Sequence, residues 1–289
     1  MILVTGAAGK TGRYVIQELV EKGARIRALV HHREYIERVE EIGAVEVTTG
    51  DLCDRGTVDQ AIEGIRAVYH IPPNVHPDEV AIGKTVISAA QSAEVEHFVY
   101  HSVVHPHIEA MPHHWQKMRV EEQLFSCGLA FTILQPAAYM QNILAQWDTM
   151  IGDGCYRVPY PLETQLSLVD LKDVAEVARL VLTEDGHAGA TYELIGTKPM
   201  SQIEVAQTLS DGLGREVTAE RTPIEVWERG ARDAGLGAYA IETLTQMFHY
   251  YEHHDFIGSP QILSRLLGRP PTTLAAVIER ERRGREKDN

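Results

Sequence analysis

The sequence predicts an α/β protein with a doubly wound parallel sheet and a smaller, mostly helical second lobe. Short apolar runs rich in β-branched residues alternate with amphipathic stretches through the first half of the chain, which is typical of strands and helices in a parallel sheet. A glycine-rich turn links the first apolar run to the first amphipathic stretch. Beyond residue 136 the alternation gives way to helix-period segments, so the second half should have a different architecture.

The pattern begins with a strand over 1–5, a helix over 10–22 and a strand over 24–30. In the helix, Val15, Ile16 and Leu19 fall on one stripe of a 3.6-residue period, and Gly23 follows as a terminator. Similar strand and helix units follow, and they give six parallel strands by residue 136. The further strands are expected over 45–48, 67–71, 97–103 and 130–134, and the further helices over 57–63, 78–92 and 114–126.

The second half is expected to form a lobe of helices with small strands. We therefore predict a first domain over 1–145 and a second over 146–289, fused without a flexible linker, with a charged tail over 279–289 that should fray. The predicted helices cover 138–150, 171–183, 201–212, 223–234 and 238–254, and the predicted strands cover 191–195 and 216–219.

Composition and charge exclude several classes of protein. With 44% apolar and 24% charged residues the chain is neither disordered nor fibrous. Its formal net charge of −14 opposes an extended nucleic-acid footprint, so no nucleic-acid partner is expected. No run of about 18 apolar residues is present, and the N-terminus lacks the features of a secretion signal. We expect a cytoplasmic protein that does not enter membranes.

No metal site is predicted. Cys53, Cys127 and Cys155 are far apart and show no C-x-x-C spacing, which indicates neither a disulfide framework nor a thiolate site. His249 and His253 have the spacing of a helical pair that can bind zinc, but a third ligand at a fixed spacing is missing.

The glycine-rich turn is the strongest functional signal. Glycines at G-x-x-G-x-x-G spacing follow a strand and open a helix. Such glycines permit a tight turn, the approach of a pyrophosphate and close packing of helix on strand, while the helix N-terminus faces the phosphates. This predicts a Rossmann-like dinucleotide-binding domain. The residues expected to line the phosphates are Thr5, Gly6, Ala8, Gly9, Lys10, Thr11 and Gly12.

The end of the second strand favours NADPH as cofactor, with NADH as the less favoured alternative. An NAD site usually has an acidic residue there for the ribose 2′-hydroxyl, but this chain has His31, His32 and Arg33. A guanidinium suits a 2′-phosphate, and the imidazoles can add donors. The alternatives are that Arg33 is a solvated loop residue or that Glu34 takes the ribose.

Asp51, with Leu52 beside it, follows the third strand. A carboxylate there can accept a hydrogen bond from the adenine amino group, so both residues are expected to contact the cofactor. The alternative role for Asp51 is a helix cap.

These motifs together resemble the NmrA-like family, atypical members of the short-chain dehydrogenase/reductase superfamily. The resemblance spans nearly the whole chain. The resemblance implies a fold similar to that of nucleotide-sugar epimerases. The family includes quinone oxidoreductases, triphenylmethane and azo-dye reductases, and redox-sensing regulators that bind NADP without turnover. The residues that carry it are Val4 to Gly12, Gly50 to Leu52, Lys117 to Glu121, Gly128, Phe131 to Pro136, Tyr139 and Asn142.

The resemblance also implies roles for residues beyond the glycine turn. Ile71, Pro72 and Pro73 would lie along the cofactor's ribose, and Ser102 would stand where the superfamily often keeps a catalytic hydroxyl. Lys117 falls at the lysine of the Y-x-x-x-K motif, where the ammonium holds the nicotinamide ribose. Pro136 and Tyr139 would lie on the wall where family members meet nicotinamide and substrate.

The chain departs from the family pattern at the proton donor. The residue four before Lys117 is His113, not tyrosine, so the usual phenol is absent. His113 is a candidate acid or proton relay, and Tyr139 is another candidate source of an O–H. The alternative for His113 is a structural or surface role. Gln135 stands where many relatives have arginine, which puts a substrate anion contact there in doubt.

Three functions follow from this reading. The first is an NAD(P)H-dependent reductase that transfers hydride to an electron-poor aromatic substrate, quinone-like or polycyclic, because such acceptors depend more on positioning than on a strong acid. The second is a non-catalytic, NADP-binding redox sensor that acts through a protein partner. The third is a biosynthetic tailoring enzyme. A homodimer is the expected assembly.

Overall fold

The computed structural model describes residues 1–288, with side chains described through Glu286. Two compact units are formed within this range. Unit 1 contains residues 1–109, 113–136 and 174–193, and unit 2 contains residues 110–112, 137–173 and 194–288.

Unit 1 is built around a seven-stranded parallel sheet with the strand order β10-β6-β5-β4-β1-β2-β3. Its central pairs are in simple register, with Ile2 opposite Ile26 on one side and Ala67 on the other. The strands are β1 (Ile2–Val4), β2 (Ile26–Val30), β3 (Glu46–Thr49), β4 (Ala67–His70), β5 (His97–His101), β6 (Phe131–Pro136) and β10 (Ala190–Leu194).

The order of these strands places a topological switch between β1 and β4. From β1 the chain proceeds to β2 and β3 on one side, and from β4 to β5 and β6 on the other. In open parallel sheets the crevice at such a switch, outside the carboxyl ends of the strands, is where ligands bind. The glycine turn follows β1 at this point.

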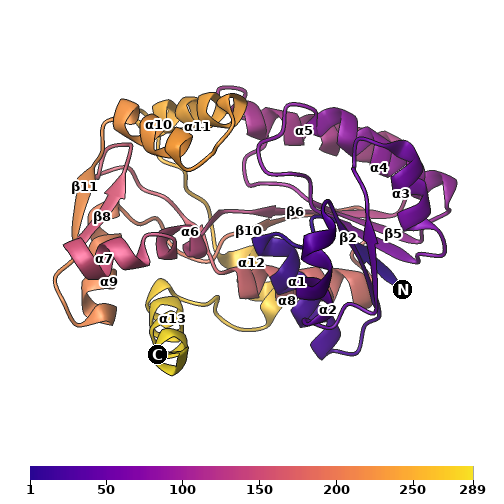
Figure 1. Cartoon of the computed structure of the whole chain (residues 1–289), viewed down its shortest axis with the longest axis horizontal. Helices are drawn as coiled ribbons and strands as arrows, with labels where there is room; N and C mark the ends of the chain where they lie inside the picture. The colour runs from indigo at the N-terminus through magenta and orange to yellow at the C-terminus, as the bar shows by residue number, and fades with distance from the viewer. Residues whose placement is uncertain (289) are drawn as a thin grey trace. The chain divides into compact units, whose positions relative to one another are not determined.

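Helices cover both faces of the sheet, α3, α4 and α5 on one and α1, α2 and α8 on the other (Figure 1). The first group packs on a core that includes Leu3, Val68 and Phe98 from the strands. The helices are α1 (Lys10–Glu21), α2 (Ile36–Glu40), α3 (Arg55–Ile62), α4 (Glu79–Ser92), α5 (Pro112–Ser126) and α8 (Leu171–Thr183), and a short 3-10 turn, η1, covers Arg33–Tyr35.

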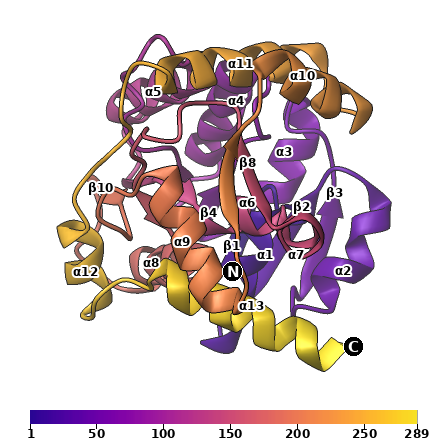
Figure 2. The same cartoon turned by 90° about the vertical axis from the view of Figure 1, so that its left-hand side faces the viewer.

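Unit 2 combines short strand pairs with helices (Figure 2). The strands β7 (Ala138–Tyr139) and β9 (Leu168–Val169) pair in parallel, as do β8 (Cys155–Val158) and β11 (Thr218–Arg221). Its helices are α6 (Met140–Leu144), α7 (Trp147–Asp153), α9 (Gln202–Leu213), α10 (Ile224–Asp233), α11 (Ala238–Tyr251), α12 (Gln261–Leu267) and α13 (Leu274–Asp288).

The structure differs from the sequence prediction at several places in the second half. The helix expected over 138–150 is strand β7 followed by α6 and α7. The segment expected over 191–195 as part of the second lobe is β10, the edge strand of the main sheet. Because β10 pairs with β6, residues 174–193 belong to unit 1. The two units are therefore not separated by a single boundary at residue 145, as the sequence analysis predicted.

The expected frayed tail is also wrong for residues 279–288, which lie in α13. Charges three and four residues apart stabilise this helix, since such positions are neighbours on a helix surface. Glu279 pairs with Arg282 and Arg283, and Glu281 pairs with Arg285. Residue 289 lies outside the described residues.

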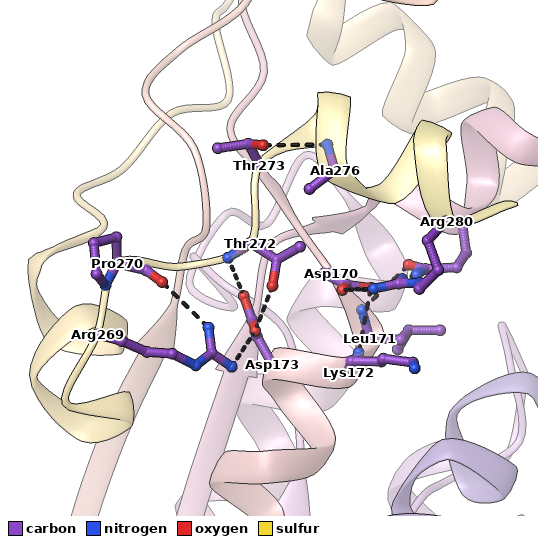
Figure 3. Close-up of polar contacts among 11 residues, drawn as sticks. Asp170, Leu171, Lys172, Asp173, Arg269, Pro270, Thr272, Thr273, Ala276 and Arg280 are labelled. Carbon is purple, nitrogen blue, oxygen red and sulfur yellow. Dashed lines mark hydrogen bonds and ion pairs between the residues drawn. The ribbon is translucent and has the colours of Figure 1, made fainter. Parts of the chain in front are cut away.

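Two buried carboxylates fasten the C-terminal segment within unit 2 (Figure 3). Asp170 receives both terminal nitrogens of Arg280, each at 2.8 Å. Asp173 receives a guanidinium nitrogen of Arg269 at 2.9 Å and the backbone N–H and hydroxyl of Thr272 at 2.6 and 2.8 Å. Both carboxylates have no exposed side-chain surface, so their partners must satisfy them.

Candidate functional site

The glycine turn has the geometry of a phosphate loop. Gly6 has a φ of +59°, which is the left-handed region that favours glycine. The backbone N–H of Gly9 donates to the carbonyl of Gly6 at 3.0 Å and closes the turn. Helix α1 then begins at Lys10, with no side-chain cap from Gly9 and no acidic residue in its first turn. This end of the helix presents donors and positive dipole to an anion.

Gly12 fits the helix against the turn. A Cβ atom on Gly12 would stand 2.4 Å from the carbonyl oxygen of Gly6 and 2.8 Å from the Cα atom and the carbonyl oxygen of Ala7. Both neighbours are backbone, so the helix would have to move away from the turn. The sequence predicted this close packing, and the geometry requires glycine at the position.

Thr5 joins the two strands at the switch point. Its hydroxyl receives the N–H of Ile71 at 2.9 Å and lies 3.1 Å from the carbonyl of the same residue. It also lies 2.9 Å from Nδ1 of His70. The turn after β1 and the segment after β4, which continues into Pro72 and Pro73, are thereby held side by side, as expected of two segments that contact one cofactor.

Positive charge gathers on the first turns of α1, including a residue that the sequence analysis did not select. Burial lowers the pKa of Lys10, and the charge of Arg13 lowers it further. Burial also lowers the pKa of Arg13, and the like charge of Arg38 lowers it further. The Nε atom of Arg13 is buried without a hydrogen-bond partner among the described residues. Like charges gathered around a guanidinium whose Nε atom has no hydrogen-bond partner among the described residues fit an anion.

A signal for Arg13 was present in the sequence, because it directly follows the third glycine of the turn. Arg38 lies within α2 and had no such signal. The predicted residues His31, His32 and Arg33 lie exposed at the end of β2, where Arg33 opens η1. The rings of His31 and His32 are 4.2 Å apart.

Asp51 is exposed after β3, and its Oδ1 atom accepts the backbone N–H of Cys53 at 2.9 Å. This hydrogen bond lowers the pKa of Asp51. Helix α3 is capped by Asp54 instead, whose Oδ1 atom accepts the N–H of Gly56 at 2.9 Å. Asp54, and not Asp51, is therefore the cap of α3. The adenine contact of Asp51 and Leu52 stays a prediction.

Lys117 points to a buried carboxylate. Its ammonium donates to Oε1 of Glu79 at 2.7 Å, and only 15% of the lysine side chain and 1% of the glutamate side chain are exposed. Glu79 lies in the first turn of α4, and Lys117 lies in α5. Sequence reasoning selected the lysine but missed its partner.

Ser102 belongs to a second buried group. Its hydroxyl donates to Oε1 of Glu121, and the amide of Gln135 donates to both oxygens of that carboxylate at 2.9 and 3.0 Å. Burial raises the pKa of Glu121, although the hydrogen bonds from Ser102 and Gln135 oppose the rise. Gln135 thus binds Glu121. The Ser102 proton is committed to the carboxylate, which leaves the serine oxygen as an acceptor.

His113 lies in α5 one turn before Lys117. Burial, and next the charge of Lys117, lower the pKa of His113 to about 4. Its Nδ1 atom is buried without a hydrogen-bond partner among the described residues. The ring is therefore neutral near pH 7, which favours a relay over a stored proton. Tyr139 lies in β7 of unit 2, and Pro136 ends β6 of unit 1.

Buried neutral histidines predict a loss of stability in mild acid. Burial lowers the pKa of His70 and His101 to about 3, and the charge of Lys117 adds to the effect in both. The unfolded chain binds protons near the ordinary pKa of 6.5, so stability is complete above that pH and falls below it. Each such histidine lowers the free energy of unfolding by up to ~1.4 kcal/mol for each pH unit below 6.5. Urea unfolding at pH 7.5, 6 and 5 measures this, and equal free energies of unfolding at the three values would contradict it.

Two features are absent among the described residues. No group of three or more His, Cys, Asp or Glu side chains there is arranged to hold a metal ion. No helix in that range is both long and apolar enough to cross a membrane.

Comparison with known proteins identifies the family. The model of the NmrA-like family matches residues 1–279. The chain belongs to the NmrA-like family. This confirms the resemblance found in the motifs, and the sheet order confirms the predicted Rossmann-like fold.

Among the proteins similar to this chain, the NAD(P)H azoreductase of Xenophilus azovorans is 28% identical and matches 95% of this chain and 96% of its own length. Quinone oxidoreductase 2 of Escherichia coli is 25% identical over 96% of this chain and 97% of its own. A (4-alkanoyl-5-oxo-2,5-dihydrofuran-3-yl)methyl phosphate reductase of Streptomyces griseus is 32% identical over 83% and 82%.

Solved structures agree on the fold. The NADPH complex of a quinone oxidoreductase from Escherichia coli superposes with a TM-score of 0.84 at 24% identity, over 97% of this chain and 99% of that one. The NADP(H) complex of a triphenylmethane reductase from Citrobacter sp. gives a TM-score of 0.83 at 24% identity, over 97% and 99%.

Proposed function

We propose that the chain is an NAD(P)H-dependent reductase that transfers hydride to an electron-poor, conjugated substrate, in particular a quinone-like aromatic compound. The observation that carries the proposal is the glycine turn at the switch between β1 and β4, where the carboxyl ends of adjacent strands meet. Relatives that match nearly the whole chain are named as reductases of azo compounds and quinones.

The residues fit NADPH. The backbone of the glycine turn and the start of α1 would hold the pyrophosphate. The guanidinium of Arg13, whose Nε atom has no hydrogen-bond partner among the described residues, would hold the 2′-phosphate with Arg38 and the predicted Arg33. Thr5, Ala8, Lys10 and Thr11 lie on the same turn. When bound, the cofactor supplies a hydride from its nicotinamide ring.

The side chains of unit 1 suit a reaction that needs little acid catalysis. Lys117 would bind the nicotinamide ribose with its ammonium, and Ser102 would offer an acceptor oxygen. His113 would pass a proton through a neutral ring. A quinone or azo acceptor is reduced without a strong acid at its oxygen or nitrogen atom, because its π-system accepts the electron pair and solvent can supply the proton. The absence of a phenol at residue 113 fits such acceptors better than simple ketones.

The decisive assay follows NADPH absorbance with the purified chain and menadione as acceptor. Steady, enzyme-dependent consumption of NADPH is the expected result. Tight NADPH binding without consumption of menadione, a triphenylmethane dye or an azo dye would contradict the reductase and favour the redox sensor.

The assignment of the 2′-phosphate predicts a selective effect on cofactor affinity. Arg13→Gln and Arg33→Gln should each raise the NADPH dissociation constant five- to a hundredfold, roughly 1–3 kcal/mol, by loss of a charge-assisted hydrogen bond. The NADH dissociation constant should stay nearly constant, since NADH has no 2′-phosphate. Calorimetric titration with both cofactors measures the two constants.

Arg25 provides the matched control for these variants. It is exposed and precedes β2, whereas Arg33 follows the same strand, so the two lie at opposite ends. Arg25→Gln should leave both affinities unchanged. An equal loss of NADPH and NADH binding in either Arg13→Gln or Arg33→Gln would reject its role in cofactor selection.

We also propose a cytoplasmic homodimer with no nucleic-acid partner. The net charge of −14 supports the last point, and the free state of Cys53, Cys127 and Cys155 suits a reducing compartment. Light scattering of the purified chain tests the dimer, and a mass near 32.2 kDa would contradict it.

A further inference from the structure

We propose that Glu79 is a positioning residue for the reaction, which fixes the ammonium of Lys117 so that its other N–H groups face the nicotinamide-side ribose of the cofactor. The inference rests on the reductase function proposed above. Glu79 is part of neither the glycine turn nor the Y-x-x-x-K motif. It lies in α4, whereas Lys117 lies in α5.

The burial of Glu79 is unusual because half of its carboxylate is unsatisfied. Oε1 accepts the ammonium of Lys117 at 2.7 Å and the hydroxyl of Tyr100 at 3.4 Å. Oε2 is buried and has no hydrogen-bond partner among the described residues. A buried carboxylate that only supports the fold is expected to have both oxygens satisfied, since an unsatisfied charged oxygen is costly.

The other buried carboxylates among the described residues meet that expectation. Glu121 receives Gln135 on both oxygens and Ser102 on one. Asp170 receives Arg280 on both oxygens, and Asp173 receives Arg269 on one and Thr272 on both. Glu79 differs from them all, which points to a role outside the fold's own stability.

The ammonium of Lys117 supplies the second half of the argument. An ammonium has three N–H donors, and Glu79 is the one hydrogen-bond acceptor that the described residues provide for this group. Two donors are left, on a side chain that is 15% exposed. Two donors held in a fixed direction suit a vicinal diol, which is the chemistry of a ribose. A flexible lysine would have to lose its rotamer freedom at each binding event, and the ion pair with Glu79 removes that freedom beforehand.

Tyr100 strengthens the arrangement from the sheet. It is fully buried in β5, and burial together with the charge of Glu79 raises its pKa well above the usual value, so the phenol stays protonated and donates. Glu79 is thereby held between a neutral donor and a cation. The ammonium is directed by the more rigid partner, because the lysine chain is the more flexible side of the pair.

A double-mutant cycle tests the inference in the full-length chain with NADPH and menadione. Glu79→Gln should lower kcat/KM for NADPH at least tenfold, and Lys117→Met should lower it further. If Glu79 acts through Lys117, the double variant should be no worse than Lys117→Met alone. Glu79→Asp, which keeps the charge on a shorter side chain, should recover part of the loss. Additive losses in the double variant would overturn the proposal.

Cofactor affinity separates this role from that of the arginines. Glu79→Gln should raise the dissociation constants of NADPH and NADH by the same factor, because both contain the nicotinamide ribose. Glu46→Gln is the matched control, since it removes another 2.7 Å ion pair of unit 1, to Arg27. It should leave the kinetic and binding constants unchanged, and affinities equally unchanged in Glu79→Gln would overturn the proposal.

The same set of variants distinguishes a loss of folding from a loss of function. If Glu79→Gln does not fold, Glu79→Gln/Lys117→Met should, because it removes both charges of the buried pair. Its kcat/KM can then be compared with that of Lys117→Met, and a lower value overturns the proposal. A native chain that neither binds nor consumes NADPH refutes the proposed function itself, whereas an active native chain with additive variants refutes only the role of Glu79.

Discussion

Gly12→Ala should abolish tight NADPH binding. The new Cβ atom would lie 2.4 Å from the carbonyl oxygen of Gly6, a separation that real Cβ atoms do not show, and the neighbouring atoms of Ala7 are also backbone. Helix α1 must therefore move away from the turn, which displaces the N–H donors that face the pyrophosphate. A displacement near 1 Å costs on the order of 100-fold in a positioned interaction, so the dissociation constant should rise by at least that factor.

The same substitution should lower the free energy of unfolding by about 1–3 kcal/mol, as overpacking of a fitted core does. Gly230→Ala is the matched control, because Gly230 lies within α10 and its added Cβ atom would meet nothing within 4 Å. That control should gain up to ~1 kcal/mol from helix propensity and bind NADPH normally. A Gly12→Ala protein with native affinity would show that the turn does not hold the phosphates.

Asp170→Ala should cost about 3–5 kcal/mol of stability, the usual cost of breaking a buried ion pair from one side. Asp170 is fully buried and binds Arg280 through two hydrogen bonds of 2.8 Å. It also accepts the amide of Gln141 and the backbone N–H of Lys172, so truncation removes an acceptor from these two groups as well as from Arg280. Urea unfolding followed by circular dichroism measures the loss.

Asp148→Ala provides the comparison. Asp148 pairs with Arg285 at 3.4 Å, but its side chain is 96% exposed. Such a pair contributes ~0–1 kcal/mol. The joint replacement Asp170→Leu/Arg280→Met should recover part of the stability lost in Asp170→Ala, because no unpaired charge is left. Equal effects of Asp170→Ala and Asp148→Ala would contradict the view that these buried carboxylates fasten the C-terminal segment.

The first half of the fold could be predicted because its signals are local. The run before Gly6 and the stripe through Val15, Ile16 and Leu19 identify β1 and α1 from neighbouring residues alone. The single helix predicted over 138–150 was wrong because α6 and α7 have the same apolar period, so the sequence shows no break between them. The one clear end signal is Gly154, which has a left-handed conformation and ends α7. The return of β10 to the main sheet is a tertiary pairing with β6 that its own residues do not signal.

The candidate site shows the same division. Gly12 and Lys117 stand in motifs, so the sequence identified them. Glu79 lies 38 residues from Lys117, and Glu121 meets Ser102 across 19 residues, so these partners appear only when the sheet brings the segments together. Arg13 had a local signal, its place after the third glycine, whereas the long-range approach of Arg38 had none.

Calorimetric titration of the purified native chain with NADPH is the most direct test of the central claim that the turn between β1 and α1 binds a pyridine nucleotide. Heat that saturates at one NADPH per chain, weaker binding of NADH, and at least 100-fold weaker NADPH binding by Gly12→Ala are the predicted results. The absence of heat with either nucleotide at millimolar concentration would contradict it.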